Sequence, residues 1–199
     1  YLLISHFDLD HYGGCIDVLK MYSIKNIITN GENKTDDRYW QEWQRVVLDE
    51  KANQIIIDNT NTLKIASSSL EFLWPDSNSV SSTIKSSNNK SIVFRLINSK
   101  MSILFTGDIE NEIENILVDE YCYKKDKCSK LKSDILKVGH HGSDSSSDKK
   151  FIQAVRPDKS VVSVGKNRFG HPSLRVLFNL DRVKTKIMRT DQLGDIIIE

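Results

Sequence analysis

The hydrophobic positions along the chain fall into short apolar runs that alternate with segments of helical spacing. Short apolar runs predict buried or half-buried strands, here at residues 1–4, 25–29, 54–58, 62–66, 69–74, 91–97, 101–106, 134–138, 159–164, 185–188 and 195–198. Helical spacing predicts helices over residues 15–22, 34–52, 110–118, 148–155 and 173–180. This alternation predicts one α/β domain spanning residues 1–199.

Local signals refine some of these elements. Thr35 or Asp36 is the expected N-cap of the second helix, and the pair Trp40 and Trp43 falls on its apolar stripe, which favours a core position over a base-stacking platform. Residues 75–90 are a Ser/Asn-rich stretch without periodicity, which predicts a mobile surface loop. The serines at 145–147 are expected to cap the helix that follows them.

Composition indicates a globular domain without a transmembrane segment or a strong net charge. The chain has 39% hydrophobic and 28% charged residues, which is typical of a globular domain, and no apolar run is long enough for a transmembrane segment. Its net charge of +1 means that any nucleic-acid binding depends on a local patch. Cys122 and Cys128 could form a disulfide across their loop. The spacing is equally compatible with three free thiols, of which Cys15 would be the third.

The richest cluster of candidate ligands follows the first apolar run, in the sequence SHFDLDHYGG at residues 5–14. Alternate side chains of an extended segment point the same way, so we expect His6, Asp8 and Asp10 to converge, with His11 beside them. The glycine pair that follows lets the chain turn sharply before the next helix. Charged groups are rarely buried without partners, so this cluster favours a divalent metal over a polar surface turn.

Later strand ends carry residues of the same kinds. Asp108 follows a predicted strand in the sequence TGD, either as a ligand or as the cap of the next helix. His140 and His141 follow another strand in GHHGS, and His171 closes the loop GKNRFGHP. All five histidines of the chain therefore lie in three turn-like stretches after strands, which indicates one shared site.

These motifs resemble the metallo-β-lactamase superfamily. The segments that carry the resemblance are SHFDLDHYGG (5–14), LFTGDIE (104–110), LKVGHHGSDSSS (136–147), VSVGKNRFGHP (162–172) and RTDQLGDI (189–196). Within the superfamily they are most similar to the soluble domain of ComEC-type DNA-uptake proteins and their stand-alone relatives, in which Asp at the position of Asp8 is typical. The resemblance implies an α/β fold, the αββα sandwich. Superfamily members begin with strands before the first motif, so we expect the chain to be N-terminally incomplete and to leave a sheet edge or face uncovered.

The resemblance also implies two divalent metal ions, zinc or manganese. His6 and Asp8 would hold one ion and Asp10 and His11 the other, with Asp108 bridging the two. Three carboxylates make the site rich in oxygen, which favours manganese without excluding zinc. No histidine lies between residues 11 and 140, so one metal position is expected to be weak.

The remaining histidines divide between metal and substrate. His140 is expected to complete the second ion's ligands and His141 to contact the substrate, although the two could exchange roles. His171 could protonate a leaving oxygen. The expected catalytic residues are Asp10, His141 and His171.

Substrate contacts are expected from Ser143 and from the segment Lys166, Asn167 and Arg168, where Arg suits bidentate phosphate binding. The implied activity is that of a metal-dependent hydrolase, a phosphodiesterase or nuclease that cuts DNA with a metal-activated water. Two other functions stay open: hydrolysis of a small phosphodiester or another ester or amide on the same scaffold, and a non-catalytic binding module. A stand-alone protein would be cytoplasmic, whereas a domain tethered to a membrane channel would be extracytoplasmic.

Overall fold

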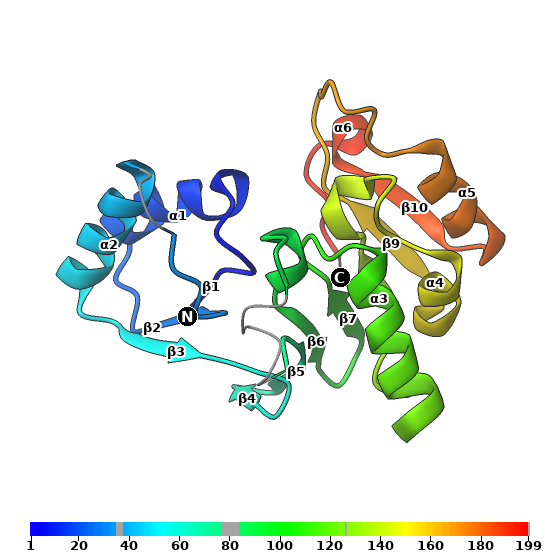
Figure 1. Ribbon diagram of the computed structural model, residues 1–199, viewed down its shortest axis with the longest axis horizontal. Coiled ribbons are helices and arrows are strands. Elements are labelled where there is room, and N and C mark those ends of the chain that lie inside the picture. Colours follow the sequence, from blue (N-terminus) through cyan, green and yellow to red (C-terminus); the bar gives the residue numbers. More distant parts are fainter. Residues whose placement is uncertain (35–37, 77–83, 126, 199) are drawn as a thin grey trace.

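Two β-sheets lie between two layers of helices (Figure 1). The computed structural model describes residues 1–34, 38–76, 84–125 and 127–198. The expected N-cap residues Thr35 and Asp36 lie outside these ranges. The arrangement is the expected αββα sandwich, and its layers follow from where the apolar faces of the elements point.

The N-terminal layers are a small parallel sheet and two helices that pack together beside it. The strand order is β1-β2-β3, so that β1 pairs only with β2 among the described strands. The elements are β1 Leu2–Leu3, α1 Leu9–Met21, β2 Asn26–Thr29, α2 Arg38–Glu50 and β3 Asn53–Ile56. Both Trp40 and Trp43 are buried, and the ring of Trp40 meets that of Phe7 edge-on at a centroid distance of 4.8 Å. Their assignment to the core is confirmed.

The larger sheet has seven strands in the order β10-β9-β8-β7-β6-β5-β4. Strands β4 to β7 are antiparallel neighbours, and β7 to β10 are parallel. The bounds are β4 Thr62–Ile65, β5 Ser68–Trp74, β6 Val93–Ile97, β7 Ser102–Phe105, β8 Ile135–Lys137, β9 Lys159–Val162 and β10 Lys186–Arg189. In the parallel half, helical crossovers bring the chain back to the same end of the sheet before each new strand.

The C-terminal helices are α3 Asn111–Val118, α4 Lys149–Val155, α5 Leu174–Arg182 and the single turn α6 Thr190–Leu193. Asp148, rather than the preceding serines, caps α4, because its carboxylate accepts the backbone N–H of Lys150 at 3.0 Å. None of the described helices is both long and apolar enough to cross a membrane. Cys122 and Cys128 form a disulfide in the turn after α3, and Cys15 is a free thiol.

Three hydrophobic clusters occupy the three spaces between the layers. The first joins the small sheet to α1 and α2, and the second lies between the sheets, where Ile28 of β2 meets Phe72 of β5. The third joins the large sheet to α3, α4 and α5 around Leu104, Ile113 and Ile152, all fully buried. Burial of each such aliphatic side chain contributes about 1.5–3 kcal/mol, so the layering itself stabilises the fold.

Three further local expectations were wrong. Helix α1 begins at Leu9 and contains both glycines of the first motif, because its buried face, Tyr12, Ile16 and Leu19, follows helical spacing and outweighs the cost of about 1 kcal/mol per glycine. Residues 195–198, which follow α6, form no strand, and Ile197 is 81% exposed there.

The third concerns the polar stretch at 75–90, of which residues 77–83 lie outside the described ranges. Its last part, Asn88–Lys90, is a 3-10 turn with a buried Asn89 rather than a surface loop. Asn89 is 2% exposed, and its side chain donates to Glu112 and accepts the backbone N–H of Glu110. These bonds hold the turn against the start of α3.

Candidate metal centre and substrate cleft

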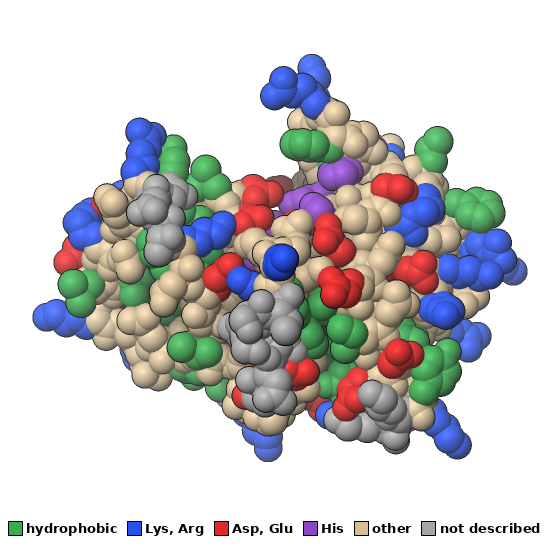
Figure 2. All heavy atoms as spheres, in the orientation of Figure 1, with side chains coloured by type: hydrophobic (Ala, Val, Ile, Leu, Met, Phe, Trp, Pro, Cys, Tyr) green, Lys and Arg blue, Asp and Glu red, His purple; other side chains and the backbone are tan. Residues whose placement is uncertain are grey.

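The candidate ligands lie where strands of both sheets end. Asp108 follows β7 and the histidine pair follows β8, and because these strands are parallel their carboxyl ends share one edge of the large sheet. His6 follows β1, and the first turn of α1 adds His11 from the opposite side. Figure 2 shows histidine side chains in a hollow between the two halves of the molecule, with acidic side chains around it.

We call Asp10, His11, Asp108 and His141, together with His6, the His/Asp cluster. The Nε2 atom of His11 lies 3.3 Å from Oδ2 of Asp108 and 3.3 Å from Nε2 of His141. The Nε2 atom of His141 lies 3.4 Å from Oδ2 of Asp108 and 3.4 Å from Oδ2 of Asp10. Four potential ligand atoms from three distant segments therefore converge.

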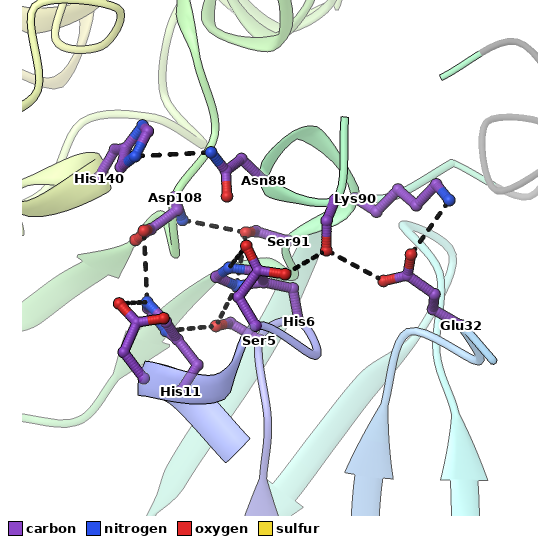
Figure 3. A network of polar contacts seen from close by, with 12 residues as sticks. Ser5, His6, His11, Glu32, Asn88, Lys90, Ser91, Asp108 and His140 are labelled. Atoms are coloured by element: carbon purple, nitrogen blue, oxygen red, sulfur yellow. Dashed lines mark hydrogen bonds and ion pairs between the residues drawn. The ribbon is translucent and has the colours of Figure 1, made fainter. Parts of the chain in front are cut away.

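His6 forms the floor of the cluster. It is fully buried, and its ring lies 4.2 Å from that of His11, centroid to centroid. Its Nδ1 atom lies 3.1 Å from the hydroxyls of both Ser5 and Ser91 (Figure 3). Ser91 also accepts the backbone N–H of Asp108 at 3.0 Å, so one hydroxyl positions two residues of the cluster.

Two buried polar atoms in this cluster have no hydrogen-bond partner among the described residues: Nε2 of His6 and Oδ1 of Asp108. Leaving such atoms unsatisfied costs about 1–3 kcal/mol each, and buried polar groups of native proteins are nearly always paired. A cation that accepts both lone pairs removes this cost. Imidazole and carboxylate are ligands of zinc and manganese, so the residues present fit a divalent metal ion.

The charge states of Asp108 and His6 suit the same ion. Burial raises the pKa of Asp108, but the hydrogen bond from His11 and the surrounding imidazoles outweigh it and hold that pKa well below its usual range. Burial, assisted by His11, lowers the pKa of His6 to about 4. An ionised carboxylate and a neutral imidazole are the forms that bind metals.

The backbone at the histidine pair decides which ring joins the cluster. His140 (φ 46°, ψ 45°) and His141 (φ 53°, ψ 19°) are consecutive left-handed residues, a conformation that costs about 1–2 kcal/mol for each. Nδ1 of His141 lies 2.7 Å from the carbonyl oxygen of Ser163, which only accepts, so Nδ1 carries the proton and Nε2 offers its lone pair to the cluster.

The ring of His140 points elsewhere. Its Nε2 lies 3.5 Å from the side-chain nitrogen of Asn88, and its Nδ1 lies 3.3 Å from the hydroxyl of Ser145 and 3.7 Å from the carboxylate of Glu110. The structure therefore places His141, and not His140, among the candidate metal ligands, which is the exchange of roles that the sequence left open.

Asp8 is only partly directed at the cluster. Its Oδ2 lies 3.7 Å from Nε2 of His6, while its Oδ1 accepts hydrogen bonds from Lys34 at 2.6 Å and Ser87 at 2.8 Å. The sequence did not indicate these two partners, because neither belongs to a motif and both lie far from Asp8 along the chain.

The residues expected to bind substrate differ in their exposure. Ser143 is 8% exposed, and its hydroxyl bonds Ser145 inside the loop. Lys166 and Arg168 are exposed in a projection between β9 and α5, which we call the arm, residues 165–171. His171 ends the arm, with its ring 5.8 Å from that of His140, and burial, followed by the charges of His140 and His141, lowers its pKa.

Comparison with known proteins identifies the family of the chain. The family model described as the metallo-beta-lactamase superfamily matches residues 1–166, most of the chain. The chain belongs to this superfamily. The match begins at residue 1 and ends in the arm, so it includes every residue of the His/Asp cluster.

Relatives within the superfamily include competence proteins. The chain is 32% identical to ComE operon protein 3 of Bacillus subtilis over 98% of its own length and 24% of the relative's. It is 31% identical to competence protein ComA of Neisseria gonorrhoeae over 97% of its length and 24% of that protein. The chain thus spans about a quarter of the curated relatives it matches.

Solved structures share the fold. CmlA, a diiron beta-hydroxylase from Streptomyces venezuelae, superposes with a TM-score of 0.61 at 14% identity over 94% of this chain and 43% of CmlA. The metallo-beta-lactamase fold protein YhfI from Bacillus subtilis gives a TM-score of 0.53 at 11% identity, over 94% of this chain and 73% of YhfI. At such identities the likeness establishes the fold alone.

Proposed function

We propose that the chain is a metal-dependent phosphodiesterase that hydrolyses DNA. The observation that carries the proposal is the His/Asp cluster, with its two unsatisfied buried atoms, beside an arm that bears Lys166 and Arg168. The competence proteins that resemble the chain support a polymer of nucleotides as the substrate. A net charge of only +1 makes such a local cationic feature necessary for binding a polyanion.

The cluster, together with Asp8, would offer ligands for two divalent ions, manganese or zinc. Those of the first would be Asp10, His11, His141 and Asp108, and those of the second would be His6, Asp8 and the remaining oxygen of Asp108. Bound ions of this kind lower the pKa of water and neutralise the charge that develops on phosphoryl oxygens. Because Lys34 and Ser87 already hydrogen-bond Asp8, the second position is the weaker of the two.

Residues outside the cluster bind and orient the substrate. Lys166 and Arg168 attract the phosphates, and the guanidinium can bind two oxygens of one phosphate. The lowered pKa of His171 favours the neutral ring when no substrate is bound. A phosphodiester anion beside it favours the protonated ring, which can then donate a proton to the leaving oxygen.

The test is cleavage of labelled single- and double-stranded oligonucleotides with Mn²⁺ by the wild type and by the variant Asp108→Asn, which keeps the size of the side chain. The control is Asp17→Asn, an exposed carboxylate on the same helix as Asp10. We expect a loss of at least about 100-fold in the Asp108 variant alone, as for removal of a preorganised electrostatic group.

Three results contradict the proposal. Undiminished cleavage by Asp108→Asn refutes the role of the cluster. Cleavage of a small phosphodiester without cleavage of DNA refutes the substrate. If the folded chain binds no metal, metal-dependent catalysis is refuted, and the remaining hypothesis is a non-catalytic binding module.

A further inference from the structure

The arm presents an aromatic ring to solvent next to the cluster. Phe169 is 80% exposed, and one face of its ring stacks on the ring of His171 at a centroid distance of 5.7 Å and an interplanar angle of 25°. The other face is open. The ring of His171 in turn lies 5.8 Å from that of His140, so the open face is two rings away from the histidine pair.

Hydrogen bonds inside the arm hold the backbone that carries this ring. The side-chain oxygen of Asn167 accepts the backbone N–H groups of Phe169 and His171, each at 3.0 Å. Its amide nitrogen donates to the carbonyl oxygens of Gly165 at 3.0 Å and His171 at 2.9 Å. Asn167 was expected to contact substrate, but its hydrogen-bonding groups are used within the arm. A preorganised loop loses little conformational entropy when a ligand binds to it.

The residues next to Phe169 in the arm give it a specific chemical setting. Lys166 and Arg168 are exposed on the same short loop, and Figure 2 shows Lys and Arg side chains on the projection above the hollow that holds the histidines. A single exposed apolar side chain needs no explanation. An aromatic face on a hydrogen-bonded loop that also bears two cations is the combination that single-stranded nucleic acids bind, through base stacking and phosphate contacts.

We infer that Phe169 is a base-stacking platform, which receives an unpaired nucleobase adjacent to the phosphodiester bond at the His/Asp cluster. The inference rests on the proposed function and narrows its substrate to single-stranded DNA or the unpaired end of a duplex. Bases paired inside a duplex have no free face to offer to the ring, so Phe169 selects against them. The arm then acts as the element that sets which part of a strand reaches the cluster.

Binding is measured first, with EDTA present so that no cleavage takes place. Fluorescence anisotropy compares a labelled single-stranded oligonucleotide, an abasic oligonucleotide of equal length and a blunt duplex. We expect Phe169→Ala to weaken binding of the single strand by about 5- to 100-fold, the range that loss of one stacked base gives. Binding of the abasic strand and the duplex should not change. Phe178→Ala, which removes another exposed phenylalanine on α5, should leave all three affinities unchanged.

A second readout reports on stacking directly. In Phe169→Trp the new indole should bind the single strand at least as tightly as the wild type does, and its fluorescence should be quenched by that strand but not by the abasic one. Equal weakening of all three ligands in Phe169→Ala, or no weakening of any, overturns the inference. Failure of the wild type to cleave any phosphodiester refutes the proposed function instead, and a base-dependent loss of affinity in Phe169→Ala would still stand in that case.

Discussion

Glu114 of α3 provides the sharpest quantitative prediction. Its carboxylate is 1% exposed and accepts the backbone N–H groups of Ser147 and Asp148 at 2.6 and 2.7 Å, which holds the end of the loop that carries the histidine pair. Burial raises its pKa to about 8, although the two N–H groups oppose the shift. The perturbation is Glu114→Gln, which keeps the shape of the side chain and removes its titration.

The direction of the pH dependence follows from the linkage between proton binding and folding. A carboxyl whose pKa is raised by folding binds its proton more tightly in the folded state, so its contribution to stability is full below pH 4.5 and is lost as the pH rises to about 8. At about 1.4 kcal/mol for each pKa unit, this loss is about 5 kcal/mol. Glutamine offers one acceptor oxygen for two backbone donors, so the variant itself carries a penalty of about 1–3 kcal/mol that does not depend on pH.

The assay is urea unfolding of wild type and Glu114→Gln at intervals from pH 5 to pH 9, with EDTA in every sample. We expect the wild type to be the more stable protein at pH 5 and its advantage to shrink by about 4 kcal/mol by pH 9, because pH 5 already lies above 4.5 and part of the loss has occurred there. The order of the two proteins then reverses. Titrating groups that both proteins share cancel in the difference. The exposed-carboxyl control Asp17→Asn should show a flat difference. A flat difference for Glu114→Gln as well would refute the raised pKa.

Three further predictions concern other parts of the molecule. Gly107→Ala should lower the free energy of unfolding, measured in urea, by at least about 2 kcal/mol. At Gly107 φ is +52°, and an added Cβ would lie 2.5 Å from the Cβ of Ser91, which positions the cluster. An unchanged free energy of unfolding would contradict this packing. Lys34→Met should tighten binding of the second Mn²⁺ about tenfold in calorimetry, since it frees Asp8 from a competing charge; unchanged binding would place that ion elsewhere. Thiol titration in urea should find one thiol before reduction and three after it, since Cys122 and Cys128 are joined.

Much of the fold could be predicted from apolar periodicity. The hairpin of β6 and β7 and the helices α3 to α5 appear where the pattern placed them, because each buries an apolar face whose spacing is visible in the chain. The start of α1 and the end of the chain were misjudged for a tertiary reason. Glycines are tolerated inside α1 because the helix packs against a sheet, and residues 195–198 leave the sheet despite their apolar run.

The sequence by itself determined the alternation of strands and helices and the residue types of the candidate centre, since these depend on periodicity and on local motifs. The superfamily and its αββα layering followed from the resemblance that those motifs carry. The tertiary structure decided which of two adjacent histidines faces the cluster, because consecutive left-handed conformations and a bond to Ser163 orient the rings. It also decided that Lys34 pairs with Asp8 and that Ser91 supports His6, contacts made across 26 and 85 residues of chain. Such contacts depend on how the layers pack together, and no local pattern in the chain encodes that packing.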